Sequence, residues 1–239
     1  MILGVPKELK NRERRVALTP DVVKSLVASG YNVVVEEGAG EASFYTNDQY
    51  KNAGATLGDK AQVYGSDVVL KVNAPQPAEI AQMKKGATLI SFMWAATNAD
   101  LVEACKQAGI NAFSMDAIPR ISRAQKMDAL SSQANLAGYK AVILCADTLG
   151  KILPMMTTAA GTIRPSKVVI FGAGVAGLQA IATAKRLGAV VEVSDIRPET
   201  KEQVQSLGGK FIEVKGDDSI KIEGGYVKIS KNPEIIRKA

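Results

Sequence analysis

Gly172, Gly174 and Gly177 form a Gly-x-Gly-x-x-Gly run directly after an apolar segment, residues 167–171. Each glycine has its own physical task at this spacing. The first permits a tight strand-to-helix turn, the second lets a diphosphate approach the backbone, and the third lets helix and strand pack closely. The helix expected next, residues 178–187, begins with free N–H groups and the positive end of its dipole, which favour negative charge. The run predicts a diphosphate-binding turn.

Asp195 follows the next apolar segment, residues 189–194. A carboxylate here can accept hydrogen bonds from both hydroxyls of an adenosine ribose and repels the 2′-phosphate of NADP, so NAD(H) is the expected cofactor. Arg197 could pair with that phosphate, but the acid ahead of it favours NAD. A turn of small residues that serves packing alone is the weaker alternative, because strand, glycines, helix, strand and acid follow in order. The predicted cofactor-binding residues are Gly172, Gly174, Val175, Ala176, Gly177, Asp195, Ile196 and Arg197.

The chain of 239 residues contains no histidine. Ser-His and Cys-His nucleophile pairs, histidine bases and histidine-containing zinc sites are thereby excluded, and no metal site is expected. Cys105 and Cys145 are far apart and are expected as buried free thiols.

The net charge of +6 comes from scattered lysines and arginines, so nucleic acid is not an expected partner. No apolar run approaches the roughly 20 residues of a membrane span, which predicts a soluble, cytoplasmic protein without direct membrane insertion.

Short apolar runs alternate with amphipathic ones over residues 1–125, which predicts an N-terminal α/β domain with a parallel sheet. Apolar residues then recur at helical spacing, and a long connecting helix is expected within residues 126–153. Residues 154–165 are predicted to be a turn-rich linker. The remainder, residues 154–239 with that linker, is expected to be an incomplete Rossmann dinucleotide-binding domain. Only the first βαβαβ half of that fold is present, so the chain is expected either to be completed by another polypeptide or to be a truncated copy.

Longer strings of sequence are more specific than the glycine run. They are Gly-Val-Pro-Lys-Glu at residues 4–8, Arg-Arg-Val-Ala-Leu-Thr-Pro at 14–20, Leu-Lys-Val-Asn-Ala-Pro at 70–75 and, above all, the segment 119–139 that begins Pro-Arg-Ile-Ser-Arg-Ala-Gln. With these strings the chain resembles the NAD(H)-binding domain of the alpha subunit of proton-translocating NAD(P) transhydrogenases. The likeness extends from residue 1 to about Tyr226, and the following residues do not share it.

The resemblance implies site residues that the glycine run does not reveal. Arg120 and Asp128 would form a polar pair beside the nicotinamide carboxamide, and Ser131 would bond to the carboxamide. Gln125 would position the ring and face the partner's NADP(H). Tyr226 would belong to a mobile loop that closes over the cofactor. From the residues alone, the alternative is that this segment only caps a long helix.

The implied reaction is direct hydride transfer from NADH to NADP⁺ on a partner subunit, and it requires no histidine base. The expected partners are a transhydrogenase beta subunit and membrane domain, with a homodimer located peripherally at the inner face of the plasma membrane. One alternative is a non-catalytic nucleotide-binding or interaction fragment. Another is an alanine dehydrogenase-like oxidoreductase, in which Lys71 and Arg15 would serve pyruvate; the segment 91–94, where the required histidine would lie, contains none.

Overall fold

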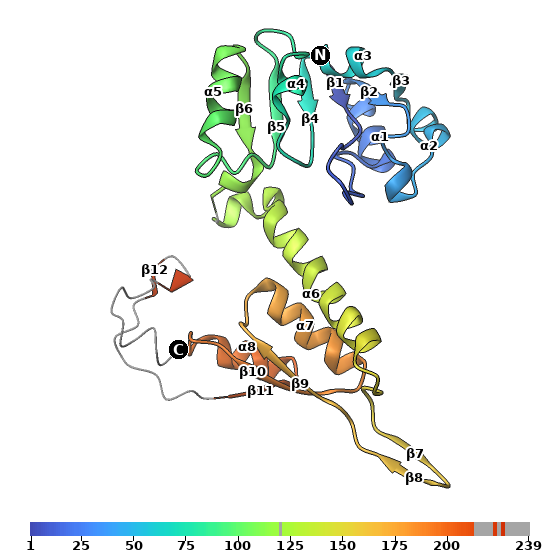
Figure 1. The fold of residues 1–239 in the computed structure, drawn as a ribbon, viewed down its shortest axis with the longest axis vertical. Helices are drawn as coiled ribbons and strands as arrows, with labels where there is room; N and C mark the ends of the chain where they lie inside the picture. Colours follow the sequence, from blue (N-terminus) through green and yellow to red (C-terminus); the bar gives the residue numbers. More distant parts are fainter. Residues whose placement is uncertain (120, 213–221, 224–225, 228–239) are drawn as a thin grey trace. The chain divides into compact units, whose positions relative to one another are not determined.

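The structure is a computed structural model that describes residues 1–119, 121–212, 222–223 and 226–227. It divides into two compact units, Met1–Ala129 and Leu130–Ala239 (Figure 1). The sequence-based fold class, an α/β protein with a parallel N-terminal sheet, a long helix and a partial second parallel sheet, is confirmed.

The first unit is built on a six-stranded parallel sheet in the order β3-β2-β1-β4-β5-β6. The four inner strands are rich in valine, leucine and isoleucine, as is usual for strands covered on both faces. All six strands are short. They are β1 (Ile2–Val5), β2 (Asn32–Glu36), β3 (Thr56–Gly58), β4 (Val68–Leu70), β5 (Thr88–Ser91) and β6 (Asn111–Ser114). Sequence analysis did not predict β3, a three-residue strand between two short helices.

Helices alternate with these strands and bury their apolar sides against them. They are α1 (Pro20–Ala28), α2 (Asn47–Asn52), α3 (Lys60–Tyr64), α4 (Pro77–Ile80) and α5 (Ala99–Gln107), with 3₁₀ turns η1 (Glu41–Ser43), η2 (Met115–Ala117) and η3 (Ser122–Met127). The helices α2 and α3 are too short to be stable by propensity alone. Capping boxes, Thr46 with Gln49 on α2 and Asp59 with Gln62 on α3, fix where they start.

The long helix α6 spans Ala129–Thr148 and is shorter than the segment that sequence analysis assigned to it. It begins at Ala129 because Asp128, with ψ 80°, leaves helical geometry after the 3₁₀ turn η3. Gly138 is where α6 meets the helix α7 (Val175–Arg186): a Cβ added there would lie 2.1 Å from the Ala176 carbonyl oxygen. Cys145 is exposed on α6, so the prediction of a buried thiol was wrong there, whereas Cys105 is buried.

The second sheet has three parallel strands in the order β11-β10-β9. Its elements are β9 (Lys167–Phe171), α7, β10 (Val190–Ser194), α8 (Thr200–Ser206) and β11 (Lys210–Phe211). Ile181, Val191 and Val193 form its core, with Val142 of α6 packed into the same cluster. Within the described residues β9 has a single sheet neighbour, β10, and Phe171 at its end is 84% exposed.

Residues 154–165 were predicted to be a turn-rich linker, and this prediction was wrong. They contain an antiparallel hairpin of β7 (Met156–Thr158) and β8 (Gly161–Ile163). Each strand is only three residues long, which is too short for a strand pattern to be recognised in the sequence. A second small antiparallel pair joins β12 (Ile222–Glu223) to β13 (Tyr226–Val227).

Candidate functional site

The glycine turn connects β9 to α7 at the carboxyl edge of the second sheet. Gly172 has a φ of 94°, which a residue with a side chain rarely adopts, and its N–H donates to the Ser194 carbonyl oxygen at 2.8 Å. A Cβ at Gly177 would lie 1.9 Å from the Gly172 carbonyl oxygen, so only glycine lets the helix return this close to the turn. The first and third glycines are thus required by the fold itself.

Gly174 differs, because no atom lies within 4 Å of the place that its Cβ would occupy. It is the N-cap of α7, and the Leu178 N–H already bonds to its carbonyl oxygen at 2.8 Å. Val175 and Ala176 occupy the first turn, where backbone N–H groups have no acceptor within the helix. The open side of Gly174 and these donors together suit a diphosphate.

Asp195 stands directly after β10, next to this turn, and only 4% of its side chain is exposed. Its Oδ2 accepts from the Ala173 N–H at 2.6 Å, so the carboxylate is fastened to the middle of the glycine run. Arg197 holds it from the other side through its backbone N–H and its guanidinium, the latter at 3.0 Å. Sequence analysis missed Ala173, whose contribution is a backbone group that no residue type signals.

The ionisation of Asp195 reflects these contacts. Burial by itself would raise the pKa of the carboxyl, but hydrogen bonds from the Arg197 side chain and from the Ala173 and Arg197 N–H groups lower it to about 2. The carboxylate is therefore negatively charged at every physiological pH. Ile196, between the two, is exposed.

Three of the residues implied for the nicotinamide side lie close together in sequence: Gln125 on η3, Asp128 directly after it and Ser131 on α6. Gln125 and Asp128 line a small cavity of about 200 Å³ together with residues of the same segment, Pro119, Ile121, Ser122 and Ala124. Ser131 is in the first turn of α6, in the second unit. Arg120 lies outside the described residues. Tyr226 is on β13, and its side chain is outside what the structure describes.

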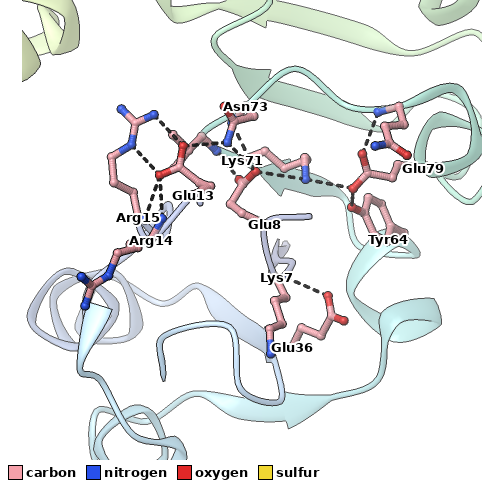
Figure 2. A network of polar contacts seen from close by, with 12 residues as sticks. Lys7, Glu8, Glu13, Arg14, Arg15, Glu36, Tyr64, Lys71, Asn73 and Glu79 are labelled. Atoms are coloured by element: carbon pink, nitrogen blue, oxygen red, sulfur yellow. Dashed lines mark hydrogen bonds and ion pairs between the residues drawn. The ribbon is translucent and has the colours of Figure 1, made fainter. Parts of the chain in front are cut away.

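Lys71, the residue that an alanine dehydrogenase-like site would use, is buried in a network of side chains (Figure 2). Its Nζ lies 2.9 Å from Glu79 Oε1 and 3.5 Å from Glu8 Oε2, with all three side chains 3% exposed or less. Tyr64 donates its hydroxyl to Glu79. Burial raises the pKa of Tyr64, and the bond to the Glu79 carboxylate raises it further. Two carboxylates thus surround one ammonium, which leaves no positive charge for an organic acid.

Arg15 is paired in the same way, at the edge of the network (Figure 2). Its guanidinium Nη2 lies 2.7 Å from Glu13 Oε2, and this hydrogen-bonded partner lowers the pKa of Glu13 to about 2. Asn73 bridges Glu13 and Glu8 through its side-chain amide. The carboxylates at 8, 13 and 79 were missed by sequence analysis. A lysine directly after an apolar strand was the available signal, since a buried ammonium requires carboxylate partners.

A parallel sheet whose carboxyl edge combines a glycine turn, a helix N-terminus and a buried carboxylate is the arrangement typical of dinucleotide-binding α/β proteins. Family models match both halves of the chain. Residues 4–137 match the alanine dehydrogenase/PNT N-terminal domain, and residues 141–238 match the alanine dehydrogenase/PNT C-terminal domain. The chain belongs to the alanine dehydrogenase/PNT family.

Individual relatives place the chain within that family. It is 47% identical over 229 residues to NAD(P) transhydrogenase subunit alpha of Haemophilus influenzae, an alignment that covers 96% of this chain and 45% of the relative. A solved transhydrogenase structure from Sinorhizobium meliloti is 50% identical, with a TM-score of 0.87, over 89% of this chain and 64% of that one. A solved L-alanine dehydrogenase is 30% identical, with a TM-score of 0.80, over 88% and 60%. The chain is a homologue of transhydrogenase alpha subunits and spans less than two-thirds of the length of these relatives.

No helix among the described residues is both long enough and apolar enough to cross a bilayer.

Proposed function

We propose that this chain is the NAD(H)-holding component of a proton-translocating NAD(P) transhydrogenase. The observation that carries the proposal is the open position of Gly174 at the start of α7, beside the buried carboxylate of Asp195. The diphosphate would lie on the N–H groups of Val175 and Ala176, and Asp195 would receive the ribose hydroxyls. Transhydrogenase relatives with 47% and 50% sequence identity to this chain support the same function.

On the nicotinamide side, bound NADH supplies the hydride, and this chain's residues orient the ring. Gln125 and Asp128, which line one cavity, would hold the ring and its carboxamide with Arg120, and Ser131 would add a hydrogen bond.

NADP⁺ would be on a beta subunit joined to a membrane domain, and Tyr226 would cover the cofactor. The assembly would be a homodimer, peripheral at the cytoplasmic face of the plasma membrane. Because the hydride moves directly between two rings, no side chain needs to transfer a proton to substrate.

The alanine dehydrogenase alternative is disfavoured by the paired state of Lys71 and Arg15. Each cation already contacts a carboxylate, so a carboxylate substrate would face like charge at both places. The competing hypothesis is that the chain is a non-catalytic fragment. A hydride-transfer assay distinguishes the two hypotheses. Mixed with a beta subunit and membrane domain, this chain should support hydride transfer from NADH to an NADP⁺ analogue, whereas a non-catalytic fragment should not.

The direct test of the binding site is calorimetric titration of the full chain with NADH and, separately, with NADPH. We expect NADH to bind with a dissociation constant in the micromolar range and NADPH not to bind. Asp195→Asn should remove the preference, because the amide no longer repels the 2′-phosphate. Equal binding of both nucleotides by the unaltered chain, or of neither, would contradict the proposal.

A further inference from the structure

The carboxylate of Asp195 is fully engaged by the protein itself. Oδ1 accepts from the Arg197 N–H at 2.8 Å and from Arg197 Nε at 3.0 Å. Oδ2 accepts from the Ala173 N–H at 2.6 Å and from Arg197 Nη2 at 3.0 Å. A carboxylate offers about four acceptor positions, so these four hydrogen bonds use its whole capacity. With 4% of the side chain exposed, ribose hydroxyls would find neither an acceptor nor access.

The four donors are not equally fixed. The Ala173 N–H belongs to the glycine turn, which is tied to β10 by the bond between the Gly172 N–H and Ser194. The Arg197 backbone is tied to α8, because the Thr200 N–H and hydroxyl both donate to its carbonyl oxygen, the hydroxyl at 2.8 Å. The guanidinium is different: it is on a flexible stem, and 23% of the Arg197 side chain is exposed. A change of its rotamer would leave the two backbone donors in place.

We propose that the Arg197 guanidinium is a clasp that closes over Asp195 in the free protein and must swing away before the adenosine ribose can bind. This inference rests on the proposed function and deepens it, because it assigns Arg197 a role through Asp195 and not through direct contact with the cofactor. A bidentate, charge-assisted pair favours the closed state. The apparent affinity is lowered by the fraction of molecules that are open, so a clasp that is open about one-tenth of the time weakens NADH binding about tenfold.

The test replaces the guanidinium of Arg197 by a group that keeps the positive charge but cannot form two parallel hydrogen bonds. Arg197→Lys retains a cation but cannot form the bidentate pair, and Arg197→Met removes both. Each variant of the full chain is titrated with NADH by calorimetry, and the association rate is measured by stopped-flow fluorescence of NADH. Arg186→Lys, at the exposed end of α7, is the matched control. The same substitutions are repeated in an Asp195→Asn background, where there is no carboxylate to clasp.

We expect Arg197→Lys to bind NADH about tenfold more tightly and to associate faster, the control to match the unaltered chain, and the gain to vanish in the Asp195→Asn background. Unchanged or weaker binding by Arg197→Lys, with the unaltered chain still binding NADH, would overturn the clasp and leave the proposed function standing. Failure of every variant to bind would overturn both.

Discussion

The three glycines of the run occupy two kinds of position. Gly172 and Gly177 are needed by the backbone, one for its φ of 94° and the other for a contact of 1.9 Å that a Cβ would make. Gly174 is not needed for folding, since the space beside it is open. Sequence spacing predicted all three positions, but only the geometry separates the two that build the turn from the one with open space beside it.

Two alanine substitutions should separate these roles. Gly177→Ala forces a methyl group against the Gly172 carbonyl and should destabilise the chain by about 1–3 kcal/mol, the usual range for overpacking. Gly174→Ala should change stability by less than about 0.5 kcal/mol, yet weaken NADH binding at least tenfold, because the methyl group occupies the diphosphate's approach. Urea unfolding and NADH titration of both variants measure this. Equal stability losses in the two variants would contradict the division.

The acid sensitivity of the site should come from Asp195. Its folded pKa of about 2 lies below the ordinary value of about 3.9, so the ionised form is held more strongly in the folded chain. The stabilisation is therefore complete above about pH 4 and is lost as the pH falls through 2, with a size of about 2 kcal/mol. The difference in unfolding free energy between the unaltered chain and Asp195→Asn should shrink accordingly from pH 6 to pH 2. A pH-independent difference would refute it.

At the scale of elements, the polar network of Figure 2 joins segments of the first unit that are distant in sequence. Glu8 follows β1, Lys71 follows β4, Tyr64 ends α3 and Glu79 belongs to α4. Glu8 also accepts from the Val72 N–H at 2.6 Å. The network thus holds the carboxyl ends of two neighbouring strands and two helices in place. This gives a structural role to Lys71, which a dehydrogenase-like site would use on substrate.

Lys71→Met should leave the carboxylates of Glu8 and Glu79 facing each other without their shared cation. Breaking one side of a buried ion pair typically costs about 3–5 kcal/mol, and the melting temperature should fall accordingly. Lys84→Met, which removes the exposed partner of Asp67, is the control and should lower the melting temperature far less, because solvent screens an exposed ion pair. NADH affinity should be the same in both variants at temperatures where they are folded. A loss of NADH binding by folded Lys71→Met would assign the lysine to the site.

The sequence was informative for elements in proportion to their length and pattern. The strand Lys167–Phe171 was predicted with its observed bounds, because a continuous apolar run ends at a glycine turn. The start of α6 was not predicted correctly. The backbone leaves helical geometry at Asp128, whereas the helical spacing of apolar residues continues through that position. For the site, Asp195 could be predicted from residue type and order. Its partners could not, because Ala173 acts through its backbone and Arg197 by a rotamer that only the fold defines.

For the whole molecule, the residues that the proposal assigns to the cofactor are divided between the two compact units. The glycine turn and Asp195 are in the unit Leu130–Ala239, while Gln125 and Asp128 are in the unit Met1–Ala129. ADP-ribose has the diphosphate and ribose but lacks the nicotinamide. We expect it to protect amides of residues 172–178 and 195–197 from hydrogen exchange, and NADH to protect residues 121–128 as well. Identical protection by the two ligands would contradict the nicotinamide role proposed for that segment.

The two cysteines give the chain a built-in selectivity toward thiol reagents. Cys105 is buried in the core between α5 and the first sheet, and burial raises the pKa of its thiol, which keeps it in the unreactive protonated form. Cys145 is exposed on α6. Ellman's reagent should therefore modify one thiol in the folded chain and two in denaturant. A fluorescent maleimide attached without any mutation would mark α6, and its emission would report on the surroundings of that helix as nucleotide or a partner subunit is added.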